Sequence, residues 1–89
     1  LIISEYGVPM PEDYGFPLER VAAFLQETWE FFLTAKDPDI GNPHDGGRLV
    51  QQWCWFSLAD SLYPTGNLVD VETGEWTPLG YIWVAYQER

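Results

Sequence analysis

Basic side chains are scarce in this chain. Its 89 residues include 4 Lys and Arg in total against 14 Asp and Glu, which gives a net charge of −10. Binding to nucleic acid or to an anionic membrane depends on Lys and Arg that neutralise phosphate. We therefore expect no nucleic acid and no membrane as a partner, and a neutral ligand such as a sugar fits this charge better. A plain acidic, soluble surface is the alternative interpretation.

Cysteine and histidine are rarer still, with one residue each. A single cysteine excludes a disulfide within the chain. Cys54 lies in an aromatic run, which predicts a buried, unreactive thiol. His44 and Asp45 adjoin in a loop and are assigned a structural role. The sequence shows no metal-ligand spacing, no glycine-rich phosphate loop and no nucleophilic serine motif, so we expect no metal and no cofactor.

Long apolar runs are also missing, since no stretch approaches the roughly 20 residues that cross a bilayer. The sequence leaves localisation open, because secreted and cytoplasmic proteins are both compatible with it. Aromatic residues, by contrast, are abundant: Trp, Tyr and Phe number 5 each. A domain of this size buries only a modest core. Either the rings are core of a larger body or some line an exposed binding surface, and apolar periodicity favours the first.

The pattern of apolar residues predicts a strand, a helix and a second strand. Consecutive apolar residues at the start predict a strand over residues 1–8, of the kind buried on both faces of a parallel sheet. Pro17 opens a helix that a 3.6-residue apolar period extends to about Lys36. A loop over 37–48 follows, and residues 49–58 are rich in strand formers. A strand, helix and strand with short connections predict parallel strands.

The last third of the chain predicts an irregular excursion and a final helix. A small hairpin is expected through Leu68–Val71, with its turn at Thr73-Gly74. Thr77 and Pro78 suit the N-cap and first turn of a helix. Two strands alone leave sheet edges unpaired. Because the chain also starts on an apolar strand without an initiator Met, we expect residues 1–89 to be a fragment, with no separate second domain.

Three motifs resemble one family of enzymes. The segment Ile3–Gly7, Ile-Ser-Glu-Tyr-Gly, resembles the seventh-strand motif of clan A glycoside hydrolases. The Trp-rich segment Trp53–Asp60 resembles their eighth strand. Asp70, Thr73-Gly74 and Thr77–Gly80 look like the segment that leads into their eighth helix. The motifs occur in the family's order and together span essentially the whole chain.

The resemblance implies a fold and a reaction. These enzymes are (β/α)8 TIM barrels, so the chain would be a partial barrel of the α/β class: strand 7, helix 7, strand 8 and helix 8. Two of the eight strand–helix units of a barrel of about 250 residues amount to roughly a quarter of that domain. The family cleaves glycosidic bonds of oligo- or polysaccharides by double displacement, with retention of configuration. Its strand-7 Glu is the catalytic nucleophile, which corresponds to Glu5 here.

The resemblance also implies a sugar-binding surface. A Trp near the end of strand 8 forms the floor beneath the reacting sugar, and we assign that role to Trp55, with Trp53 in the barrel core. We also count Tyr6 and Tyr63 among the substrate-binding residues, and one of them is expected to donate a hydrogen bond that keeps Glu5 charged. Asp60 follows the second strand, where it would bind a sugar hydroxyl or brace the loop, and bracing is favoured.

One part of the family's machinery is missing. Its acid/base is a second Glu, usually after an Asn, and the chain contains no Asn-Glu pair. Retaining hydrolysis needs two carboxyl groups about 5–5.5 Å apart. We therefore expect the chain alone to be inactive, with the rest of the barrel and a carbohydrate substrate as its partners. A non-catalytic carbohydrate-binding module and a structural α/β domain are the alternatives, and the glycan and the endo or exo action stay open.

Overall fold

Two parallel strands and two helices make up the regular structure of residues 1–10 and 12–87, which the computed structural model describes. The elements in chain order are β1 (Ile2–Gly7), η1 (Glu12–Tyr14), α1 (Leu18–Thr34), η2 (Pro43–Asp45), β2 (Gln52–Phe56), η3 (Pro64–Gly66) and α2 (Pro78–Gln87). β1 and β2 pair in parallel. The predicted α/β class and the strand–helix–strand–helix order are confirmed, with both strands shorter than expected.

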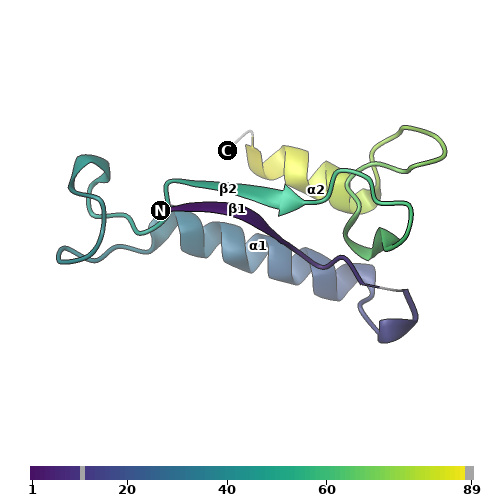
Figure 1. Cartoon of the computed structure of the whole chain (residues 1–89), viewed down its shortest axis with the longest axis horizontal. Helices are drawn as coiled ribbons and strands as arrows, with labels where there is room; N and C mark the ends of the chain where they lie inside the picture. Colours follow the sequence, from purple (N-terminus) through teal and green to yellow (C-terminus); the bar gives the residue numbers. More distant parts are fainter. Residues whose placement is uncertain (11, 88–89) are drawn as a thin grey trace.

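The strands and helices run in opposite directions along the molecule. Figure 1 shows the carboxyl ends of β1 and β2 at the same end as the beginnings of α1 and α2. The segments 8–10, 12–17 and 57–77 gather at this end, which we call the carboxyl end of the sheet. The loop 35–51 lies at the opposite end. There the Asp45 carboxylate accepts hydrogen bonds from Arg48 and Gln51, at 2.9 and 3.3 Å, as a structural role requires.

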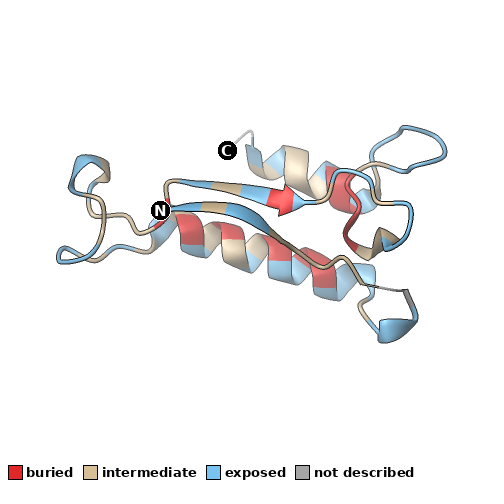
Figure 2. Ribbon diagram, in the orientation of Figure 1, coloured by how far each residue is buried: buried red, intermediate tan, exposed pale blue. Residues whose placement is uncertain are grey.

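The core forms between the sheet and one stripe of α1. The stripe repeats every three or four residues, as the apolar period predicts; its buried members are Val21, Ala22, Leu25, Trp29 and Phe32. The first four of these pack with Trp55, Leu68 and Leu79. Figure 2 shows the buried residues along one side of α1, at the end of β2 and at the start of α2. Many of the abundant rings are therefore core, because the aromatic side of the sheet faces the helices.

The sheet has two unlike faces. Trp53 and Trp55 point towards the helices, where Trp53 contacts the ring of Trp29 and Trp55 contacts the ring of Trp83. Cys54 and Phe56 alternate with them and are exposed on the other face, which no described helix covers and which we call the open face. The prediction that Cys54 is buried is wrong, since strand alternation sends it away from the two tryptophans.

A β-bulge interrupts the pairing in the middle of β1. Ile3 pairs with Trp53 and Tyr6 with Trp55, so two residues of β1, Ser4 and Glu5, stand opposite one residue of β2. The extra residue keeps Ile3 and Tyr6 on the helix side despite their odd spacing. It leaves Ser4 and Glu5 exposed together, as a bulge re-aims the side chains that it contains.

The segment between η3 and α2 contains a hairpin that is shorter than predicted. Val69 and Trp76 form an isolated antiparallel bridge, and the Asp70 carboxylate accepts the amides of Glu72 and Thr73 in the turn. Thr77 then caps α2, because its hydroxyl accepts the Gly80 N–H at 3.0 Å, as predicted. None of the helices in the described ranges is long and apolar enough to cross a membrane.

Candidate functional site

Glu5 lies in the second half of β1, on the open face. Its side chain is exposed because the bulge turns both Ser4 and Glu5 away from α1. In parallel α/β sheets, ligands bind beyond the carboxyl ends of the strands. The position of Glu5 therefore leaves its carboxylate accessible to a substrate at this end of the sheet.

Tyr6 faces the opposite way from Glu5. The Thr28 hydroxyl of α1 donates a hydrogen bond to the Tyr6 hydroxyl at 3.3 Å, and the ring meets those of Trp55 and Phe32 edge-on. Burial raises the pKa of the Tyr6 phenol above its usual value, and the hydrogen bond with Thr28 opposes part of that shift. The hydroxyl is thus held on the helix side of the sheet, so the arrangement does not include the hydrogen bond expected from Tyr6 to Glu5.

Trp55 is part of the core. It is 8% exposed, and its indole N–H donates to the Gly66 carbonyl oxygen at 2.8 Å. The rings of Tyr6, Phe24 and Trp83 surround it. The expectation of a free ring face for a sugar therefore does not match its position. Trp53, expected to be the deeper residue, is only half-buried on the same side of β2.

Phe56 was missed by the sequence argument and lies where a stacking ring was expected. It ends β2, pairs with Gly7 and is 36% exposed on the open face. Glu5 stands two residues before Gly7 on the neighbouring strand. Glu5 and Phe56 therefore lie on the same face of two neighbouring strands. Strand alternation is the sequence signal that identifies Phe56, because its side chain must lie on the face opposite to that of Trp53 and Trp55.

Asp60 braces the loop that follows β2. One oxygen of its carboxylate accepts the amides of Leu62 and Tyr63, both at 2.8 Å. The favoured bracing role therefore fits its hydrogen bonds, which already occupy that oxygen. Tyr63 itself is exposed just before η3, so its ring is accessible from solvent.

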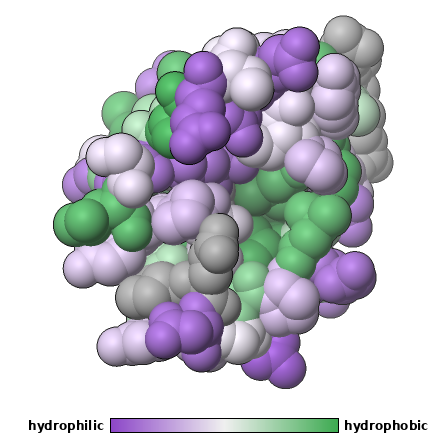
Figure 3. Space-filling view, turned by 90° about the vertical axis from the view of Figure 1, so that its right-hand side faces the viewer, coloured by the Kyte–Doolittle hydropathy of each residue, from purple (hydrophilic) through white to green (hydrophobic). Residues whose placement is uncertain are grey.

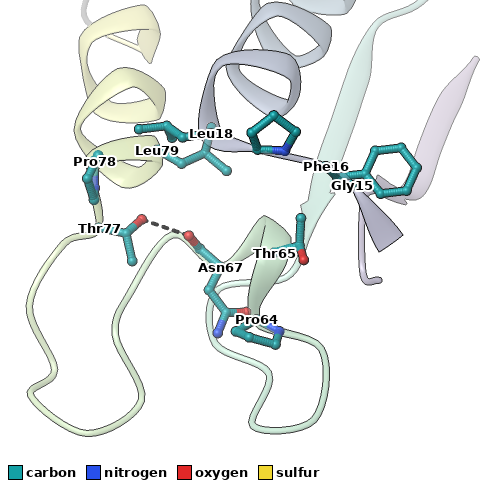
Figure 4. A pocket seen from close by; sticks show the side chains of 10 residues that line it. Gly15, Phe16, Leu18, Pro64, Thr65, Asn67, Thr77, Pro78 and Leu79 are labelled. Carbon is teal, nitrogen blue, oxygen red and sulfur yellow. Dashed lines mark hydrogen bonds between the residues drawn. The ribbon is translucent and has the colours of Figure 1, made fainter. Parts of the chain in front are cut away.

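Asn67 is a second residue that the sequence argument missed. It is the polar residue among the buried side chains of the described ranges, at 6% exposure. Its side-chain amide bonds both main-chain groups of Asp60, with Oδ1 accepting at 2.8 Å and Nδ2 donating at 2.9 Å. The Thr77 hydroxyl donates to its carbonyl oxygen at 2.7 Å, as Figure 4 shows. Asn67 thus links the loop to the start of α2.

Two cavities open at the carboxyl end of the sheet. One of about 450 Å³ lies between the beginnings of α1 and α2 and η3, with Phe16, Leu79 and Thr65 among its walls (Figure 4). Another of about 360 Å³ lies beside the end of β1, against Val8 and Phe24. Figure 3 looks onto this end and shows hydrophobic residues in its recessed middle with hydrophilic residues around them.

Within residues 1–10 and 12–87, no three His, Cys, Asp or Glu side chains gather as a metal site would need. Comparisons of the chain with protein families, with curated proteins and with solved structures each give no match.

Proposed function

We propose that the chain forms the last two β/α units of a retaining glycoside hydrolase barrel, in which Glu5 is the nucleophile. The observation that supports this most is the bulge in β1, which presents Glu5 on the open face near the carboxyl ends of two parallel strands. Active sites of (β/α)8 barrels lie at that end. The motif resemblance of Ile3–Gly7 and Trp53–Asp60 points to the same chemistry.

The unpaired strand edges and the open face support the proposal that the chain is part of a larger barrel. Each strand of the β1–β2 pair has one edge with which no other described strand pairs, and the open face exposes Ile2 and Phe56. Parallel sheets occur almost only with both faces covered, and unpaired edges are normally paired or protected. Further strands of a barrel would pair with these edges, and the open face would line the barrel interior.

Glu5 would act on the anomeric carbon of a sugar. One carboxylate oxygen attacks that carbon and forms a glycosyl ester, while the bond to the leaving-group oxygen breaks and that oxygen takes a proton from a second carboxylic acid. Water, deprotonated by the same second group, then releases the sugar and restores the Glu5 carboxylate. The second carboxyl group would come from the rest of the barrel, and the reaction requires no metal or cofactor.

Phe56 would form the floor beneath the reacting sugar in place of Trp55. An exposed ring at the end of β2 would offer its face to the C–H groups of a pyranose, whereas Trp55 is buried in the core. Trp55 would support the site from below, since its bond to Gly66 fixes the segment after the strand. Phe56 and Trp55 would thus have different roles because their side chains lie on opposite faces of the sheet.

The test is a Glu5→Gln substitution in the longest natural polypeptide that contains this chain. We expect near-total loss of hydrolysis of an activated aryl glycoside, because an amide cannot form the glycosyl ester. Glu75→Gln, in the exposed turn before α2, is the matched control and should hydrolyse normally. An activated 2-deoxy-2-fluoroglycoside should label the peptide that contains Glu5, as seen by mass spectrometry. Full activity of Glu5→Gln would contradict the proposal.

A further inference from the structure

Gly7 ends β1 where the main chains of the two strands come into close contact. It pairs with Phe56, the last residue of β2. A Cβ atom on Gly7 would lie far inside 3.0 Å of the Phe56 carbonyl oxygen, a separation that Cβ atoms in proteins essentially never show. Gly7 is not among the glycines with a positive φ. The close approach of β2, and not the backbone conformation, therefore requires a glycine at this position.

The segment that follows Gly7 is held in place. The Met10 N–H donates to the Val8 carbonyl oxygen at 2.9 Å, and the Thr65 hydroxyl donates to the Met10 carbonyl oxygen at 2.6 Å. Gly66 lies so close to this segment that a Cβ there would come within 3.2 Å of the Val8 carbonyl oxygen. The chain after β1 thus has little room to move away from β2.

The bulge on the other side of Gly7 is less restrained. Ser4 and Glu5 lie between the paired residues Ile3 and Tyr6, where the register of the two strands is interrupted. Both are exposed, so no surrounding core fixes their side chains. A displacement of β1 that begins at Gly7 is therefore taken up in the bulge, and it moves the Glu5 carboxylate.

We propose that Gly7 is a positioning residue for the nucleophile, because the missing side chain lets β1 approach β2 and so fixes the place of the Glu5 carboxylate. This rests on the proposed function. Gly7 lies two residues from Glu5 and would act through it, without touching the substrate. A misplacement of a reacting group by about 1 Å costs on the order of 100-fold in rate. A shift of the strand that is small for the fold is thus large for the reaction.

The test is Gly7→Ala in the longest natural polypeptide that contains the chain. An activated 2-deoxy-2-fluoroglycoside reports the attack by Glu5 directly, because it labels that residue. We expect the labelling rate at saturation, per folded molecule, to fall about 100-fold. The concentration that gives half of the maximal rate should stay unchanged, since the groups that bind the sugar are retained. Circular dichroism measures the folded fraction.

Two further glycines supply the comparison. A Cβ on Gly41 would likewise lie inside 3.0 Å of a main-chain oxygen, that of Gly47, but in the loop 35–51 at the opposite end. Gly41→Ala should therefore destabilise the fold in the same way and leave the labelling rate per folded molecule at the parent value. Gly66→Ala pushes the segment after β1 more gently, since its Cβ would meet the Val8 carbonyl at 3.2 Å. It should slow labelling by less than Gly7→Ala does.

The outcomes separate the positioning role from the proposed function. If Gly7→Ala labels as fast as Gly41→Ala, or if both are slowed equally, Gly7 does not position the nucleophile. If Gly7→Ala fails to fold, Gly66→Ala decides, and a labelling rate equal to the parent's overturns the role. With Glu5→Gln inactive, these results leave the proposed function standing. An active Glu5→Gln overturns the proposed function, and the role of Gly7 with it.

Discussion

Glu5 and Tyr6 adjoin in the sequence, yet their side chains lie in opposite environments. Glu5 is exposed on the open face, while Tyr6 is half-buried against α1 and bonded to Thr28. Strand geometry explains the difference, since successive side chains point to opposite faces. The bulge then decides which residue faces which side, because it shifts the alternation by one position between Ile3 and Tyr6.

Burial of the Tyr6 phenol predicts a loss of stability at alkaline pH. Its pKa in the folded chain is raised above the usual value of 10.0, chiefly by burial. The unfolded chain therefore releases this proton at lower pH than the folded chain. The contribution to stability is complete below about pH 10 and is lost as the pH rises through the higher, folded pKa.

Urea unfolding followed by tryptophan fluorescence at increasing pH would measure this effect. Tyr6→Phe should flatten the alkaline fall in the free energy of unfolding, because it removes the ionising group. Tyr81→Phe removes an exposed phenol from α2 and should keep the fall. An equal alkaline fall in Tyr6→Phe and in the parent chain would contradict the assignment.

At the scale of elements, α1 is predictable because one stripe of apolar residues defines both its length and its buried face. Its predicted limits differ from the observed helix by one or two residues. The bulge in β1 is not predictable in this way, since no glycine or proline marks it. Simple alternation from Ile3 would place Glu5 on the helix side and Tyr6 on the open face, which is the reverse of what the bulge produces.

The orientation of β2 is likewise predictable only in part. Alternation correctly places Trp53 and Trp55 on one face, but it does not say which face meets the helices. The helices decide it, because Trp29 and Trp83 offer rings for both tryptophans to contact. The burial of Asn67 depends likewise on a loop that returns to it from Asp60, seven residues away, and no local pattern records such a contact.

The start of α2 depends on one hydroxyl with two bonds. Thr77 Oγ1 accepts the Gly80 N–H at 3.0 Å and donates to the Asn67 carbonyl at 2.7 Å. Thr77→Ala removes both, and we expect a loss of about 1–2 kcal/mol in the free energy of unfolding, the usual size for an N-cap. Urea denaturation monitored by circular dichroism measures it.

Two variants separate the cap from a general effect of changing a threonine. Thr77→Ser keeps the hydroxyl and should retain most of the stability. Thr34→Ala removes an exposed hydroxyl whose bond goes to the Glu30 carbonyl of the same helix, so its effect should be small. A loss in Thr34→Ala as large as that in Thr77→Ala would remove the capping explanation.

At the scale of the whole molecule, an uncovered sheet and a large negative charge act against each other. The free edges of β1 and β2 and the apolar residues of the open face favour association with another sheet. A net charge of −10 opposes contact between two copies, and salt screens that repulsion. The chain alone should therefore associate more strongly as the salt concentration rises.

Ile2 tests which surface drives this association. It lies in β1 and is 62% exposed, so Ile2→Lys places a charge where a second sheet would pack, a substitution that natural sheet edges use against aggregation. We expect this variant of the 89-residue chain to stay monomeric at salt concentrations at which the parent associates, as measured by sedimentation velocity. Ile40→Lys, in the loop 35–51 outside the sheet, makes the same change of charge and should associate like the parent. If Ile2→Lys associates like the parent, the open sheet is not the surface through which copies meet.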